Sequence, residues 1–271
     1  MAAVLSTQVG VSIFYAHVRR RTPSHASGCL YSGPPLRVTQ PRPGANPNRL
    51  LRIPPNEFEQ LRPYLEAVSL TPRDFHLPAG ESLSHAYFAY SGVVSLIVEM
   101  QSGDSVEVAT VGRQGMLGIS LLLEADPAPY EMVCQVPGEA VRVPSRTFVQ
   151  LSQRLPTFRR LLLRYALCLL HEVARTAACN RLHTVEQRLA RWLLLCSDQA
   201  ATGSYPLTHE SLARMLGARR PYVSQMARAL QQAGVIQYHR GTLRILDRAG
   251  LEAVSCEDYR ATQQEYARLL G

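Results

Sequence analysis

The chain has 271 residues, of which 46% are hydrophobic, so it is long and apolar enough for two modest folded domains. All 29 basic residues are arginines, and against 21 acidic residues they leave a net charge of +8. There is no run of 18 apolar residues, and the arginines at 19–21 follow the apolar start instead of preceding it. The sequence therefore predicts neither a membrane span nor a secretory signal.

The excess of arginine is concentrated in one part of the chain. Residues 48–179 carry 12 arginines and 13 acidic residues, whereas residues 180–248 carry ten arginines and four acidic residues. A basic segment inside an otherwise balanced chain favours a polyanionic partner. A solvated face in an arginine-rich proteome is the alternative.

Residues 1–47 are rich in proline, glycine and serine, and they contain five arginines and no acidic residue. This composition predicts a disordered arm. A start codon assigned too far upstream would give the same pattern, because folded periodicity begins only near Asn48.

The next segment predicts a helix. Phe58, Leu61, Leu65 and Val68 recur at helical spacing after Pro55, a residue that favours the first turn.

From about residue 73 to residue 143 the period changes to two. The runs "YFAYSGVVSLIVEM", "QSGDSVEVATVG" and "YEMVCQVPGEAVRVP" are typical of short strands. Regular spacing of such strands predicts an antiparallel barrel or roll, which we place within a sensor domain over residues 48–152. Turns are predicted at Gly80, Gly92, Gly103, Gly112, Gly115 and Gly138.

A long helix is predicted over residues 153–183. Its small or apolar residues alternate by three and four, as in the a/d seam of a coiled coil, and this favours pairing with the same helix of a second chain. Packing of the helix on its own roll is the alternative. The predicted dimerisation residues are Leu163, Ala166, Leu170, Val173, Ala177 and Asn180.

Residues 184–256 predict a winged helix-turn-helix. The patterns "HESLARML" and "RRPYVSQMARAL" meet at Gly217, which suits the left-handed backbone of a tight turn. Thr208 is placed to cap the first helix at Ser211, and Pro221 is tolerated in the first turn of the second. The runs "VIQY" and "LRIL" predict a hairpin wing, and residues 257–271 predict a C-terminal tail helix.

The second helix of such a unit lies in the DNA major groove with its N-terminal residues at base edges. Arginine donors suit guanine and phosphate, as at Arg219 and Arg220, and Gln225 suits adenine. Tyr222 and Ser224 lie within reach of phosphates. The predicted DNA-binding residues are Thr208, His209, Arg219, Arg220, Tyr222, Ser224, Gln225, Arg228, His239 and Arg240.

The order of these features resembles the cyclic-AMP receptor/Fnr (Crp/Fnr) family of bacterial transcription regulators over roughly residues 50 to 250. The resemblance rests on the roll ("LPAGESL", "YSGVVSLIVE", "SGDSVEVATVGRQGMLG"), the long helix and "LTHESLARMLGARRPYVSQMARALQQAGVIQYHRG". It implies an α+β chain with a cyclic-nucleotide-binding-like β-roll, a dimerisation helix and a C-terminal winged helix-turn-helix. It also implies a homodimer on two-fold symmetric double-stranded DNA, an effector in the roll, and RNA polymerase as a candidate partner.

The roll departs from the family pattern at the phosphate-binding positions. Members that bind cyclic nucleotides carry a Gly-Glu pair and then an Arg-Ser or Arg-Thr pair. Here Ile119 replaces the glutamate, and residues 129–131 replace the arginine pair. No arginine lies between Arg113 and Arg142, and a buried phosphate without a cation is unfavourable. We therefore expect an effector other than cyclic AMP or GMP, with unknown binding residues.

The recognition helix departs as well. Arg220 matches the first base-contacting arginine of the best-known members, but Pro221 and Gln225 replace their glutamate and second arginine. The operator should therefore differ from theirs.

The sequence predicts no enzyme. It lacks the G-x-S-x-G, P-loop and dinucleotide patterns, and "HEVAR" at 171–175 lacks the second histidine of a zinc protease. A signalling module that regulates a protein partner without reading DNA is the alternative for the whole chain.

The cysteines predict no metal site and no cofactor. None of the six forms a C-x-x-C pair or a zinc-spaced cluster with histidine, and they suit a reducing cytosol. Haem ligation by His76 or His85, and redox sensing at Cys168 or Cys179, are the alternatives to ordinary packing.

Overall fold

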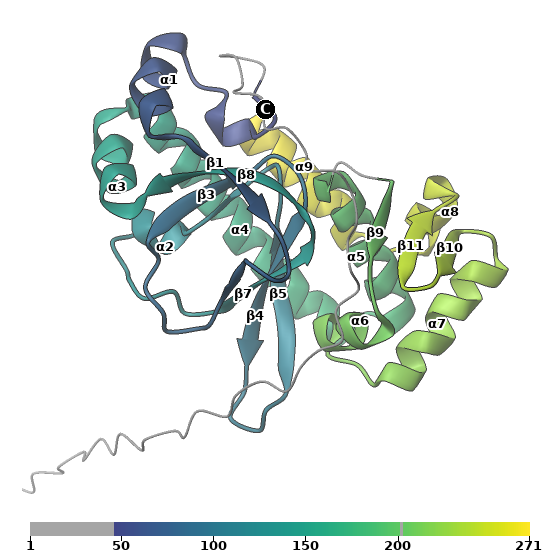
Figure 1. The fold of residues 1–271 in the computed structure, drawn as a ribbon. Coiled ribbons are helices and arrows are strands. Elements are labelled where there is room, and N and C mark those ends of the chain that lie inside the picture. The colour runs from purple at the N-terminus through teal and green to yellow at the C-terminus, as the bar shows by residue number, and fades with distance from the viewer. Residues whose placement is uncertain (1–45, 201–202) are drawn as a thin grey trace, which may run out of the picture. The chain divides into compact units, whose positions relative to one another are not determined.

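The structure is a computed structural model that describes residues 46–200 and 203–271 (Figure 1). The predicted disordered arm, except for its last two residues, lies outside the described residues. None of the described helices combines the length and apolar character that a membrane span needs.

The N-terminal part is a roll of two four-stranded antiparallel sheets, with strand orders β1-β8-β3-β6 and β2-β7-β4-β5. The chain passes from one sheet to the other between β7 and β8, where only Pro137 separates the strands. Residues that alternate into the space between the sheets form the core, as in β7, where Met132 and Cys134 are buried. The strands are β1 Glu66–Leu70, β2 His76–Leu77, β3 His85–Ala89, β4 Val93–Glu99, β5 Ser105–Val111, β6 Met116–Leu117, β7 Glu131–Val136 and β8 Gly138–Pro144.

The helix predicted through Val68 is shorter than expected. Helix α1 spans Pro55–Leu61, a 3-10 turn follows over Arg62–Tyr64, and the chain then enters β1, which pairs with β8. Pro63 has no N–H to continue the helical hydrogen bonds, so the apolar spacing beyond it belongs to a strand.

The predicted glycine turns are found at Gly80, Gly92 and Gly103, which all have positive φ, and at 112–115. The turn predicted at Gly138 is wrong, because this residue begins β8. A Cβ atom at residue 138 would lie 2.2 Å from the Ser91 carbonyl oxygen, so a glycine is needed where the backbone at Ser91 passes close to β8.

The longest helix of the described chain is α4, Pro156–Leu182, and it packs against the roll through Phe158, Leu162 and Tyr165. The carboxylate of Glu57 accepts hydrogen bonds from the backbone N–H groups of Thr157 and Phe158, which lie in the first turn of α4. The shorter helices α2 and α3 span Ile119–Leu122 and Ser145–Arg154.

A second hydrophobic core lies in the C-terminal part, drawn in green to yellow in Figure 1. Its wing has three strands in the order β10-β11-β9 instead of the two predicted. The tail helix α9 returns to α4, where the Tyr266 hydroxyl donates to Glu172. The elements are α5 Val185–Ala200, β9 Ser204–Pro206, α6 His209–Leu216, α7 Arg220–Gln232, β10 Ile236–His239, β11 Thr242–Ile245, α8 Arg248–Val254 and α9 Asp258–Leu270.

Candidate nucleic-acid interface

Local signals build the helix-turn-helix as the sequence predicts. The Thr208 hydroxyl accepts a hydrogen bond from the Ser211 N–H at 3.0 Å and caps α6. Gly217 ends α6 with a φ of 55°, and Pro221 lies in the first turn of α7. The inward faces of both helices are buried through Leu212, Met215, Leu216, Val223, Ala227 and Leu230.

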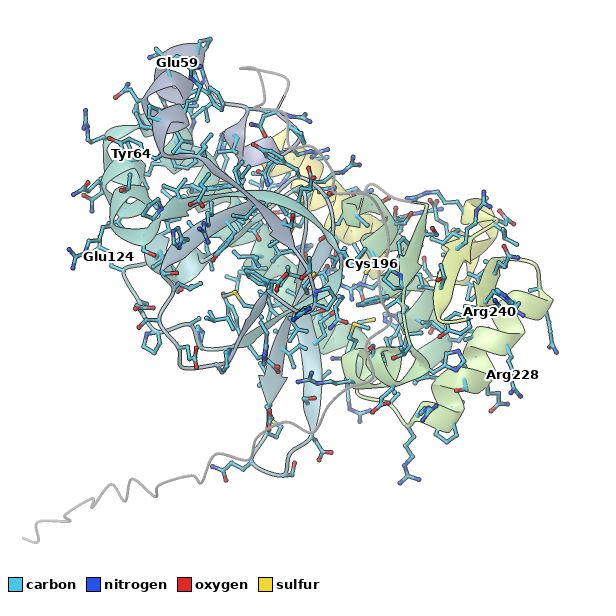
Figure 2. All side chains as sticks on the ribbon, in the orientation of Figure 1. Glu59, Tyr64, Glu124, Cys196, Arg228 and Arg240 are labelled. Atoms are coloured by element: carbon cyan, nitrogen blue, oxygen red, sulfur yellow. The ribbon has the colours of Figure 1, made fainter. Side chains whose placement is uncertain are left out.

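The outward face of α7 is basic and polar. Arg219 and Arg220 stand at its N-terminal end, and Tyr222, Gln225 and Arg228 follow; all five are exposed. Figure 2 shows Arg228 on α7 beside the wing that carries Arg240. This face can therefore present forked donors and an amide to a nucleic acid without losing contacts within the protein.

His209 and Ser224 have a different role from the exposed residues. Both are half-buried, and the Ser224 hydroxyl lies 2.9 Å from His209 Nδ1. The His209 ring stacks on Tyr238 with 4.6 Å between centroids. Burial, with the charges of Arg220 and Arg228, lowers the pKa of His209 and favours the neutral ring. This cluster joins α6, α7 and the wing, a link that helical periodicity did not reveal.

The wing tip is a tight two-residue turn. Arg240 and Gly241 have φ values of 47° and 77°, and His239 pairs with Thr242 across the hairpin. Positive φ at both central residues is the requirement of a type I′ turn. The turn leaves His239 and Arg240 exposed, as a groove contact requires.

Helix α4 carries an exposed stripe of small and apolar residues, made of Leu163, Leu167, Leu170, Ala174 and Ala177. The members recur at spacings of four and three, and the leucines are 46%, 47% and 65% exposed. Two other residues of the predicted seam, Ala166 and Val173, pack partly against the roll core, whereas Asn180 is exposed. The sequence did not predict Leu167 and Ala174. Two neighbouring rows of residues on this helix both repeat at intervals of three and four, and the spacing alone does not say which row is exposed.

Residues 119–131 form the segment in which the sequence predicts no phosphate-binding pair. Ile119, Leu121 and Leu122 are buried in the roll core. The Glu131 carboxylate receives Arg214 of α6 at 2.6 Å and lies 2.8 Å from His76 Nε2. His76 therefore has a carboxylate partner, and Glu131 joins the roll to the helix-turn-helix.

Comparison with known proteins identifies both parts. A cyclic nucleotide-binding domain model matches residues 67–154, and a Crp-like helix-turn-helix domain model matches residues 187–254. The global nitrogen regulator of Nostoc sp. (strain PCC 7120) is 23% identical over 170 residues, which cover 59% of this chain and 76% of that protein.

Solved structures share the fold. FixK2 from Bradyrhizobium japonicum is similar with a TM-score of 0.59 and 16% identity, over 71% of this chain and 98% of that chain. The c-di-GMP responsive regulator CLP of Xanthomonas campestris is similar with a TM-score of 0.55 and 19% identity, over 70% of this chain and 98% of that chain.

These matches agree with the predicted α+β architecture and with its order along the chain. The roll carries the first match, and α6, α7 and the wing lie within the second. The family acts through DNA binding rather than through turnover of a substrate. The chain is a DNA-binding transcription regulator of the Crp/Fnr family, with a cyclic-nucleotide-binding domain followed by a Crp-type helix-turn-helix.

Proposed function

We propose that two copies of this chain pair through α4 and read a pseudo-palindromic operator, with one α7 helix in each half-site. The observation that carries the proposal is the exposed N-terminal end of α7, where the side chains of Arg219 and Arg220 make no hydrogen bond or ion pair with another described residue. Arginines at the N-terminal end of the second helix of a helix-turn-helix are placed to reach base edges.

The exposed stripe on α4 supports the dimer. Exposed leucines three and four residues apart are typical of the seam of a two-stranded coiled coil, and burying them against a partner helix is favourable. A parallel pair of α4 helices would relate the two DNA-binding domains by a two-fold axis. Such symmetry requires a two-fold symmetric DNA site.

The contribution of Arg220 provides the first test. Selection from a random DNA library should enrich a two-fold symmetric motif. Arg220→Ala should lose about 1–3 kcal/mol of binding free energy on that motif and should relax preference at one position in each half-site. The measurement is the affinity for the selected site and for its single-base variants at fixed salt.

Arg240→Ala is the matched control, because it removes one exposed arginine from the wing. If Arg240 contacts phosphate, its loss should weaken binding to all sequences alike and reduce the salt dependence. An unchanged base preference in Arg220→Ala would contradict base reading by this residue. No enriched motif, even with cell extract present, would favour a signalling module that acts on a protein partner.

The proposed effector is not a cyclic mononucleotide. The observations that support this are the buried, apolar Ile119 and the Glu131 carboxylate, because the nearby cation Arg214 is already paired with that carboxylate. Removing a phosphate from water without a cation is costly.

Millimolar cyclic AMP or cyclic GMP is therefore expected to leave the melting temperature unchanged. A ligand at 100 times its Kd would stabilise the folded protein by about 2.7 kcal/mol, which a thermal scan detects easily. A family member that binds cyclic AMP serves as the positive control. A saturable rise in melting temperature with either nucleotide would overturn this part of the proposal.

A further inference from the structure

Four side chains with metal-binding atoms converge where α4 ends. Cys179 lies in the last turn of α4 and His183 directly follows the helix, whereas Cys256 and Asp258 come from the junction between α8 and α9. Their ligand atoms all lie within 4.8 Å of one another. Since 77 residues separate Cys179 from Cys256, no sequence spacing could reveal the cluster.

The distances suit a four-coordinate site. Cys179 Sγ lies 3.5 Å from Cys256 Sγ, and His183 Nδ1 lies 3.3 Å from Asp258 Oδ2. Cys256 Sγ lies 3.9 Å from the same carboxylate oxygen. Zinc-ligand bonds of about 2.0–2.3 Å in a tetrahedron place neighbouring ligand atoms roughly 3.3–3.8 Å apart. An ion therefore fits between these atoms with only small movements.

The interior of the cluster is poorly compensated without a cation. Cys179, Cys256 and Asp258 are each no more than 3% exposed. His183 Nδ1 is buried and has no well-formed hydrogen bond, although it lies near the Asp258 carboxylate. A buried nitrogen and a buried carboxylate oxygen that face one space, with two thiols beside them, are the environment that a metal ion satisfies.

The outer groups of the cluster orient the inner ones. Arg175 binds Oδ1 of Asp258 at 3.1 Å, which leaves Oδ2 facing the cluster. Glu257 lies 3.3 Å from His183 Nε2, so the ring can donate there and keep Nδ1 for a metal. Carboxylate partners of this kind fix the tautomer and the direction of metal-binding histidines.

We propose that Cys179, His183, Cys256 and Asp258 bind one divalent transition-metal ion of the zinc type. Two thiolates, one imidazole nitrogen and one carboxylate oxygen form a donor set that zinc takes in closed structural sites. Binding would release the protons of the two thiols to solvent, with no change of oxidation state.

A disulfide between the two cysteines is the competing interpretation. It would involve only Cys179 and Cys256 and would leave the buried Nδ1 atom of His183 without a hydrogen-bond partner. The full set of four donors therefore favours a metal.

The position of the site implies a structural role. His183 and Thr184 form the link between α4 and α5, and Cys256 and Asp258 belong to the segment that follows the wing. A bound ion would tie the end of the dimerisation helix to both ends of the DNA-binding domain. The proposal stands independently of which DNA sequence is read.

Cobalt(II) titration of the reduced, chelator-treated full chain tests the site. We expect the visible bands of tetrahedral Co²⁺ and a thiolate charge-transfer band that saturate at one ion per chain and disappear when Zn²⁺ is added. Cys256→Ala should abolish the charge-transfer contribution of that thiolate and weaken binding strongly. Glu257→Gln, which changes only an outer partner, should weaken binding by about 10-fold.

Cys168→Ala is the matched control, because this thiol is buried on the same helix but lies outside the cluster. It should bind Co²⁺ as the wild type does. If Cys256→Ala fails to fold by circular dichroism, His183→Gln provides the same comparison.

Absence of a Co²⁺ spectrum in the wild type, or equal binding by wild type and the cluster variants, would overturn the proposal. A Cys179–Cys256 disulfide in air-exposed protein, with no Co²⁺ uptake after reduction, would overturn it as well and would assign the pair to redox chemistry.

Discussion

A double substitution on the exposed stripe, Leu163→Glu with Leu170→Glu, is expected to convert the protein to a monomer and to abolish binding to the operator at concentrations that saturate the wild type. The two leucines are 46% and 65% exposed in the single chain, so the change costs the isolated fold little. In a paired helix the four glutamates of the two copies would be buried without partners, a penalty of several kcal/mol. Light scattering after gel filtration gives the mass, and fluorescence anisotropy gives the affinity.

Leu123→Glu is the control for this experiment. Leu123 is 60% exposed and directly follows α2 in the roll, and it is not one of the residues of the stripe. This variant should keep the mass and the DNA affinity of the wild type. A double variant of the stripe that still has the mass of two chains would show that pairing uses another surface.

The helix-turn-helix could be predicted in detail because its signals are local. Thr208, Gly217 and Pro221 each determine the backbone within a few residues, and the structure has the cap, the turn and the helix start at these positions. The same reasoning was wrong about β1, because the strand is specified by its pairing with β8 and not by its own spacing.

Contacts between distant segments could not be predicted from the sequence. The pair of His209 and Ser224 depends on how α6 and α7 pack. The cluster around Cys179 depends on the return of α9 to α4, which brings Cys256 within 3.5 Å of it. Residue spacing reports only on residues that are close along the chain, so these sites can be identified only once the fold is known.

Glu107 is expected to make the stability of the protein depend on pH. Its carboxylate is buried, accepts a hydrogen bond from Trp192 Nε1 at 2.8 Å and is also bonded by the Ser95 hydroxyl. Burial raises the pKa of Glu107 to about 8, and the charge of Glu172 adds to the rise. The two hydrogen bonds and the charge of Arg191 oppose it but are outweighed.

The direction of the effect follows from linkage. Between pH 4.5, the ordinary pKa of this group, and about pH 8, the folded chain keeps the proton that the unfolded chain has lost. This contribution to stability is fully present below pH 4.5 and is lost as the pH rises to about 8, at a rate on the order of 1 kcal/mol per pH unit. The glutamine of the Glu107→Gln variant cannot ionise. The difference between the free energy of unfolding of the variant and that of the wild type should therefore shift in favour of the variant as the pH is raised from 5 to 8. Urea unfolding at several pH values measures the difference, and Glu59→Gln, which changes a surface carboxylate, should follow the wild type.

The same titration should also affect DNA binding, because Glu107 and Ser95 belong to the roll whereas Trp192 lies in α5, at the start of the DNA-binding domain. Above pH 8 the ionised carboxylate would be buried at this junction, and the contact between the two parts should weaken. The pH dependence of operator affinity should therefore differ between wild type and Glu107→Gln across this range. If the two proteins give superimposable curves for both unfolding and DNA binding, then Glu107 is ionised throughout, and solvent reaches it at the junction.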